Sequence, residues 1–249
     1  MKKLWRLLTK KEQGSSVYIL AMMFLLLIIV LFYFFYYQKA IEVVGNNLKN
    51  DLDSSNLASA YVDLNQYAAD REDFHIVSLD DNASDFSSTG NAQVLSHTSR
   101  EYKDVLEHFT RYLTAIRENI GVKNSGFSGG SCGWAANMLN AKNFKIDRYM
   151  ILEPERANGS VTYNRVTVYE IKDITNVENP VPEITRYRYS SASVPINGAV
   201  ATIDTPSVYS QLSFTLALPI NALNADNREE KVVTTSAMCG VVKNEEPER

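Results

Sequence analysis

The sequence predicts an α+β chain: a long N-terminal transmembrane helix that continues into an amphipathic stalk, followed by an extracytoplasmic antiparallel β-sheet domain with one packed helix. A 21-residue apolar run, helical spacing of apolar residues beyond it, and β-branched alternating runs in the C-terminal half indicate this fold. We expect four parts, which are a basic cytoplasmic leader at 1–14, the helix and its amphipathic extension at 15–70, a polar linker at 71–97 and the α+β domain at 98–249.

The apolar run extends from Val17 to Tyr37 and contains no charged residue, no Pro and no Gly. At about 1.5 Å rise per residue, a helix of this length matches a hydrocarbon core of about 30 Å. Five cations precede the run and only Lys39 follows closely, which predicts a cytoplasmic N-terminus and an exported C-terminal part. A cleaved secretory signal has a shorter apolar region that ends in small residues, and neither feature is present. Membrane lipid is therefore an expected partner, in a single-pass protein of the cell membrane.

The helix is predicted to continue to about Asp70. Apolar residues follow at steps of three, four or five, as one helical face requires: Ile41, Val44, Leu48, Leu52, Leu57, Tyr61, Leu64 and Ala68. Such a face either folds back on the chain's own domain or packs beside copies of itself or related subunits. The spacing alone leaves both alternatives open.

The exported part is predicted to contain one helix followed by a sheet. Thr98 and Glu101 fit a capping box at the start of the helix, and Gly121 fits its end near Ile120. Asn158–Gly159 is a strong hairpin signal and predicts an antiparallel sheet. The expected strands are Lys145–Leu152, Ser160–Ile171, Ile184–Ser191, Ala199–Ile203, Gln211–Leu218 and Lys231–Val242.

Composition and motifs give no indication of catalysis. The net charge of −4 and the pI near 5.5 offer no basic surface for nucleic acid. The string Ser131-Cys132-Gly133-Trp134 resembles the surroundings of a thiol-protease nucleophile, but the histidines needed as its base (His75, His97 and His108) all precede it. No spacing typical of zinc ligands occurs, and the acidic run with Asp80, Asp81 and Asp85 lacks EF-hand order. We expect no enzyme activity, no cofactor and no metal.

Cys132 and Cys239 are the only cysteines, and an exported domain meets conditions in which they can pair. A disulfide between them would close a long loop and stabilise the domain by about 4 kcal/mol. Two reduced thiols are the alternative. The tyrosines Tyr187, Tyr189 and Tyr209 fit either a protein interface or sheet packing.

The junction from Lys10 to Tyr18, KKEQGSSVY, resembles the start of type IV pilin-like proteins, especially the TadE/TadF-like pseudopilins of tight-adherence pilus systems. The resemblance implies cleavage by a prepilin peptidase between Gly14 and Ser15, retention of the helix, and assembly with other pilin-like subunits on a membrane platform. This family commonly has Glu at the fifth residue after the cut, where this chain has Ile19. The alternative is an anchored extracytoplasmic binding or scaffold protein that joins no filament.

Overall fold

The structure is a computed structural model, and it describes residues 14–61, 75–77, 92–123, 126–127, 141–156, 163–178, 180–217 and 230–240. It contains one long apolar helix near the N-terminus, a second helix and an antiparallel sheet, which confirms the predicted α+β class. The chain divides into two compact units, Met1–Val43 and Val44–Arg249. We call the second unit the head.

The long helix α2 runs without interruption from Gly14 to Ser59, so the unit boundary falls inside it. Its part in the head buries Val44, Leu48 and Leu52 completely or nearly so. The helix ends eleven residues before the predicted Asp70, and Ala60 and Tyr61 are not helical. Residues 62–74 lie outside the described part of the chain.

The second helix, α4 (Arg100–Asn119), lies close to its predicted position but has a different cap. Ser99 is the N-cap, and its side chain accepts a hydrogen bond from the Tyr102 backbone N–H at 3.2 Å. The predicted capping box of Thr98 and Glu101 is therefore wrong. Gly121 follows the helix with φ of 74°, a left-handed conformation that glycine adopts without steric cost, so the predicted stop is confirmed.

The head contains one six-stranded antiparallel sheet in the order β1-β6-β5-β4-β9-β10. Its strands are β1 (Gln93–Val94), β4 (Lys142–Arg156), β5 (Tyr163–Ile174), β6 (Thr185–Tyr189), β9 (Ser207–Ala217) and β10 (Glu230–Gly240). The short strands β2 (Val122–Lys123) and β3 (Gly126–Phe127) form a separate pair. β4 pairs antiparallel with β5, as the hairpin signal at Asn158–Gly159 predicted, although that turn lies outside the described residues.

A hairpin missing from the sequence prediction covers part of one sheet face. Its strands are β7 (Ser193–Ile196) and β8 (Ala199–Thr202), joined by Asn197 and Gly198 with φ of 49° and 78°. Two residues with positive φ are what a tight hairpin turn requires, and Asn-Gly is its preferred sequence. Asn197-Gly198 is therefore a hairpin signal in the sequence.

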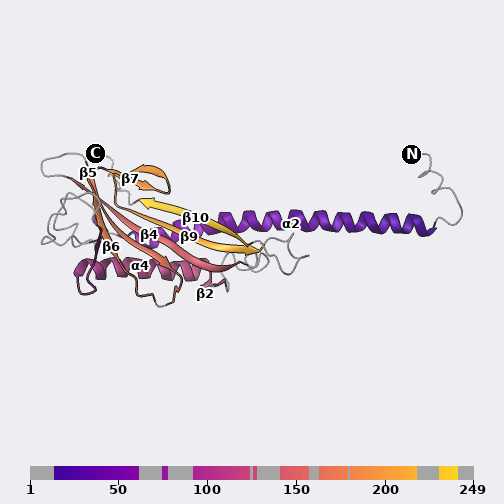
Figure 1. Ribbon diagram of the computed structural model, residues 1–249, viewed down its shortest axis with the longest axis horizontal. Helices are drawn as coiled ribbons and strands as arrows, with labels where there is room; N and C mark the ends of the chain where they lie inside the picture. The colour runs from indigo at the N-terminus through magenta and orange to yellow at the C-terminus, as the bar shows by residue number, and fades with distance from the viewer. Residues whose placement is uncertain are drawn as a thin grey trace, which may run out of the picture. The chain divides into compact units, whose positions relative to one another are not determined.

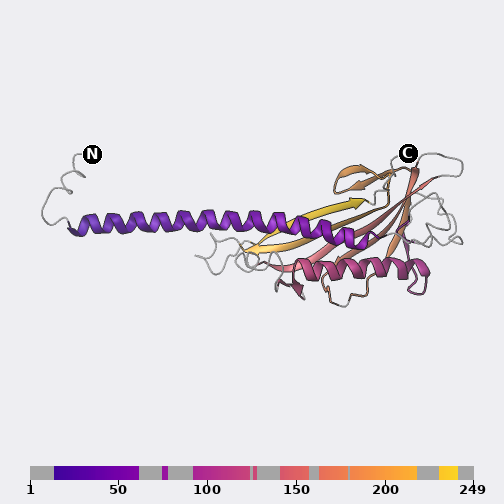
Figure 2. The ribbon, with the colours of Figure 1, turned by 180° about the vertical axis from the view of Figure 1, so that it is seen from behind.

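The sheet packs on both faces (Figures 1 and 2). On one face, Tyr149 of β4 packs against Phe109 and Tyr112 of α4, with ring centroids 5.1 and 4.9 Å apart. On the other face, Met150 belongs to a cluster with the β7–β8 hairpin that includes Leu152, Val166, Val168, Val194, Ile196, Ile203 and Tyr209. Neighbouring residues of a strand point to opposite faces, so one strand contributes to both layers.

Candidate functional site

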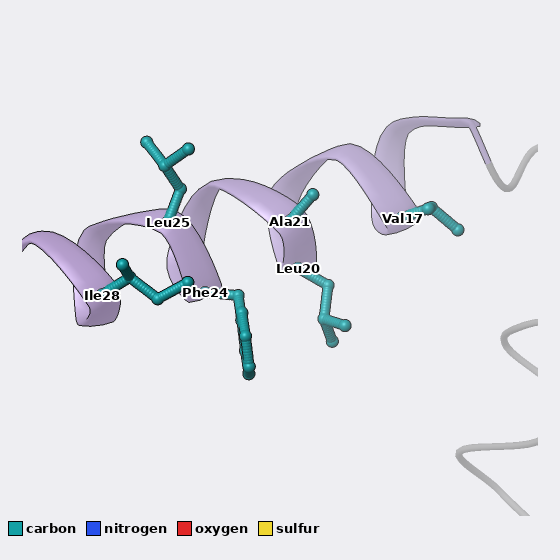
Figure 3. Close-up of a pocket in the computed structure, with 6 residues that line it drawn as sticks. All are labelled: Val17, Leu20, Ala21, Phe24, Leu25 and Ile28. Atoms are coloured by element: carbon teal, nitrogen blue, oxygen red, sulfur yellow. The ribbon is translucent and has the colours of Figure 1, made fainter.

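The membrane-crossing candidate is the only helix among the described residues that is long and apolar enough by length and composition to cross a bilayer. Within it, six side chains line a shallow apolar hollow along the helix (Figure 3): Val17, Leu20, Ala21, Phe24, Leu25 and Ile28. Exposure of the larger ones ranges from 39% for Ile28 to 64% for Phe24. A helix that is apolar all round needs lipid or other apolar helices around it.

The predicted processing junction lies at the start of α2. Gly14 and Ser15 are the first two residues of the helix, and the leader before them lies outside the described residues. Ile19 is 60% exposed. An apolar side chain at this position adds to the apolar surface that the helix presents.

Polar side chains join the last turn of α2 to strands β9 and β10 of the head. Asn56 is fully buried; its Nδ2 donates to the Ala237 carbonyl of β10 at 3.0 Å, and its Oδ1 accepts from the Ser210 hydroxyl of β9 at 2.7 Å. Ser59, also fully buried, donates its hydroxyl to the Asn56 carbonyl at 2.9 Å. A buried amide that satisfies both its donor and its acceptor fixes orientation as well as contact.

Two buried histidines and one buried carboxylate extend this polar region. His108 of α4 contacts the Ser59 carbonyl through Nδ1 at 2.6 Å. Glu153 of β4 accepts hydrogen bonds from the backbone N–H groups of Ile76 and Val77 at 2.6 and 2.9 Å, and His75 Nδ1 lies 3.5 Å from its other oxygen. We call the side chains of His75, His108 and Glu153, with the carbonyl of Ser59, the polar clasp.

Sequence patterns do not indicate the polar clasp, because its histidines are far apart along the chain and Glu153 lies in a predicted strand. His75, Ile76 and Val77 fall in the predicted polar linker, yet all three are buried. His97, the third histidine, lies outside the clasp and packs edge-on against Tyr102. Burial lowers the pKa of His108 below its usual value, which keeps the ring neutral.

Tyr61 covers the outer side of the clasp. Its ring stacks on His108 with centroids 4.3 Å apart, and the Arg111 guanidinium lies 3.8 Å from the centroid of the Tyr61 ring. The Tyr61 hydroxyl donates to Glu107 at 2.9 Å. Burial and this hydrogen bond raise the pKa of Tyr61 to about 12, and the hydrogen bonds from Arg111 and Tyr61 lower the pKa of Glu107.

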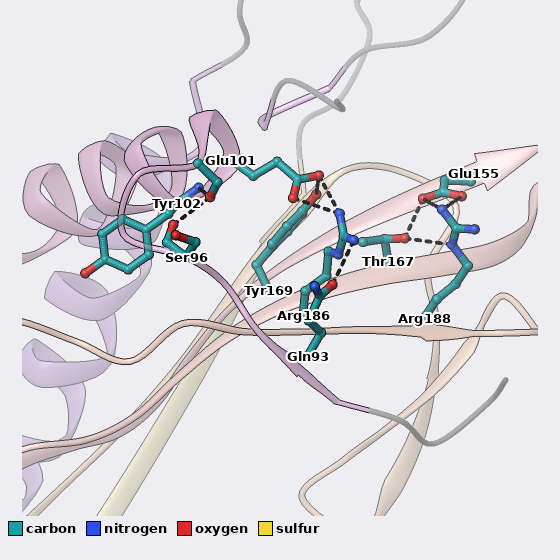
Figure 4. Close-up of polar contacts among 10 residues, drawn as sticks. Gln93, Ser96, Glu101, Tyr102, Glu155, Thr167, Tyr169, Arg186 and Arg188 are labelled. Atoms are coloured by element: carbon teal, nitrogen blue, oxygen red, sulfur yellow. Dashed lines mark hydrogen bonds and ion pairs between the residues drawn. The ribbon is translucent and has the colours of Figure 1, made fainter. Parts of the chain in front are cut away.

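A second buried polar group joins α4 to the sheet (Figure 4). Arg186 of β6 donates from Nη1 to both carboxylate oxygens of Glu101 at 2.6 and 2.7 Å, and from Nη2 to Gln93 of β1 at 3.1 Å. The Tyr169 hydroxyl lies 3.4 Å from the same carboxylate. Glu101 thus pairs with Arg186 rather than completing a capping box.

The other predicted sites have mixed outcomes. Cys239 is partly exposed on β10, and Cys132 lies outside the described residues, so their pairing stays a prediction. Burial is the main cause of the raised pKa of the Cys239 thiol. The acidic run at 80–85 and the string at 131–134 also lie outside the described residues. Tyr209 belongs to the core cluster, and Tyr187 and Tyr189 pack against it, which is sheet packing.

Among the residues that the structure describes, no three His, Cys, Asp or Glu side chains are grouped so that they could hold a metal ion. No protein-family model matches the sequence, and the comparisons with curated proteins and with solved structures also find no match. The apolar part of α2 and the polar contacts of its last turn are the features of the described residues that bear on a packing role.

Proposed function

We propose that this chain is a membrane-anchored minor pilin-like or pseudopilin-like subunit for assembly of a pilus or secretion apparatus. Its partners would be membrane lipid, other pilin-like subunits, a prepilin peptidase and a membrane platform, and its N-terminus would be cytoplasmic with the head outside. The carrying observation is the unbroken helix from Gly14 to Ser59. One helix supplies both an exposed apolar segment and the buried residues Leu48 and Leu52 of the head.

The two ends of α2 have different surroundings, one exposed and apolar and the other buried in the head, and this difference supports a packing role. An exposed apolar helix can exchange lipid for neighbouring apolar helices at little cost in hydrophobic free energy, because both surroundings are apolar. The other end of the same helix is held by Asn56 and Ser59, which are fully buried. Such a subunit can change its surroundings in the membrane while its head stays folded.

The decisive experiment identifies the mature N-terminus by mass spectrometry, in cells that contain a prepilin peptidase. We expect Ser15 as the first residue. Gly14→Val should retain residues 1–14, whereas the matched variant Ser16→Ala should be cleaved like the original chain. Retention of Met1–Gly14 in the unmodified protein would count against the proposal.

A second candidate is an anchored extracytoplasmic binding or scaffold protein, and Ile19 in place of the family's Glu favours it. It predicts the same topology but an uncut leader and no cofractionation with pilus components. Protease added to intact cells should digest the head in both cases. A head protected from protease would contradict both candidates.

A further inference from the structure

Six consecutive aromatic residues lie at the C-terminal end of the apolar run in α2. They are Phe32, Tyr33, Phe34, Phe35, Tyr36 and Tyr37, and we call them the aromatic belt. Aromatic residues make up 10% of the whole chain, so six in succession are a local concentration that a spanning helix does not itself require. The first five are 45–71% exposed, so most of the belt faces the surroundings of the helix.

The aromatic belt encircles the helix rather than marking one side of it. Successive residues of an α-helix are separated by about 100°, so six in a row place rings on every side. A contact with one neighbouring helix needs only residues that share a face, three or four positions apart. Rings on all sides fit a partner that surrounds the helix, and lipid is such a partner.

The belt also lies where the residue chemistry changes along the helix. Residues 19–31 carry no hydroxyl, amide or charged side chain, and Tyr18 precedes them with 75% exposure. From Tyr18 to Tyr36 the helix rises by about 27 Å at about 1.5 Å per residue, close to a hydrocarbon core of about 30 Å. The first charged side chains within α2 follow the belt, where Lys39 pairs with Glu42 at 2.5 Å. Charge is costly in hydrocarbon, so a lipid–water boundary must fall before Lys39.

We propose that the aromatic belt binds the headgroup region of a lipid bilayer and marks the point at which α2 leaves the hydrocarbon core. Tyrosine suits this position because its ring can lie among acyl chains while its hydroxyl reaches water or a lipid phosphate. Beyond the belt the helix is no longer exposed all round, since Ala40 is fully buried. The inference rests on the membrane anchor in the proposed function and is independent of leader cleavage and filament assembly.

Depth-dependent fluorescence quenching tests this placement, with the full-length chain in vesicles of dioleoyl-phosphatidylcholine. The vesicles contain phosphatidylcholine brominated either close to the headgroup or close to the chain ends, and bromine quenches tryptophan only at short range. Trp5→Phe and Trp134→Phe remove the native signals. In that background, Phe35→Trp reports on the belt, and Leu27→Trp is the matched control in the middle of the span. If circular dichroism shows that Trp134→Phe unfolds the head, Trp134 is kept and the spectrum of the chain without the new tryptophan is subtracted.

The two positions lie about 12 Å apart along the helix, so we expect bromines near the headgroup to quench Phe35→Trp at least about twofold more than those at the chain ends. Leu27→Trp should show the reverse order. Equal ratios in the two variants would overturn the proposal and leave the membrane anchor standing. Quenching of Leu27→Trp alone would also overturn it, because protein would then cover the belt. If neither tryptophan is quenched, α2 does not lie in lipid and the anchor fails as well.

Discussion

Removing one member of the buried pair between Glu101 and Arg186 should destabilise the head strongly. The two side chains are 6% and 10% exposed, so Arg186→Met leaves a carboxylate without its cation in a nearly dry site. Breaking a buried pair in this way typically costs about 3–5 kcal/mol. For a unit of this size, that corresponds to a fall in melting temperature of roughly 6–20 °C.

The assay is thermal unfolding of the full-length protein in detergent, followed by circular dichroism. The double variant Glu101→Leu/Arg186→Met should recover most of the loss, because no unpaired charge remains. Glu107→Gln is the matched control, since it breaks an exposed pair with Arg111 and should cost less than about 1 kcal/mol. If Arg186→Met has the same melting temperature as Glu107→Gln, the reasoning is refuted.

Three further predictions use the same unfolding assay or a membrane assay. Ser99→Ala should cost about 1 kcal/mol through loss of the α4 cap, whereas Thr98→Ala should cost only a few tenths; equal effects would contradict the observed cap. Gly45→Ala should stabilise α2 by about 0.5–1 kcal/mol, because a Cβ added at this position meets nothing within 4 Å. Gly121→Ala should instead destabilise the head by about 1 kcal/mol, because φ at this position is positive. Leu27→Arg should impair membrane insertion by about 3 kcal/mol, measured as the fraction extracted by alkaline carbonate; unchanged retention would argue against a spanning helix.

Local patterns predicted α4 and the longer strands of the head, but not β1, β2, β3 or β7. β4, β5, β6, β8, β9 and β10 each overlap a predicted strand, because β-branched and alternating residues mark a half-buried strand. The buried apolar residues of α4 recur at helical spacing, and they are Tyr102, Val105, Phe109, Leu113 and Ile116. The N-cap lies one residue after the predicted one, because the Ser and Thr residues at 96, 98 and 99 are all capable caps and the pattern does not rank them. Glu101, the expected partner in the capping box, pairs with Arg186 instead.

Sequence patterns failed where buried residues are polar. After Leu52 the inward face of α2 continues through Ser55, Asn56 and Ser59, whereas the predicted Leu57 is 62% exposed. Apolar spacing identifies a buried helix face only where that face is made of apolar residues, so it does not indicate a face made of small polar side chains. The clasp was hidden for a related reason, because its partners meet only through contacts such as that between His108 and Ser59.

The hydrogen bond from Asn56 to Ala237 joins residues 181 positions apart. It cannot form until β10, close to the C-terminal end of this sequence, has been synthesised and has paired with β9. Helix α2 is thus synthesised well before the strand that accepts its Asn56 hydrogen bond. Truncation before β10 would leave α2 without the acceptor of its Asn56 hydrogen bond, so the last turn of α2 reaches its final contacts only after β10 has been made.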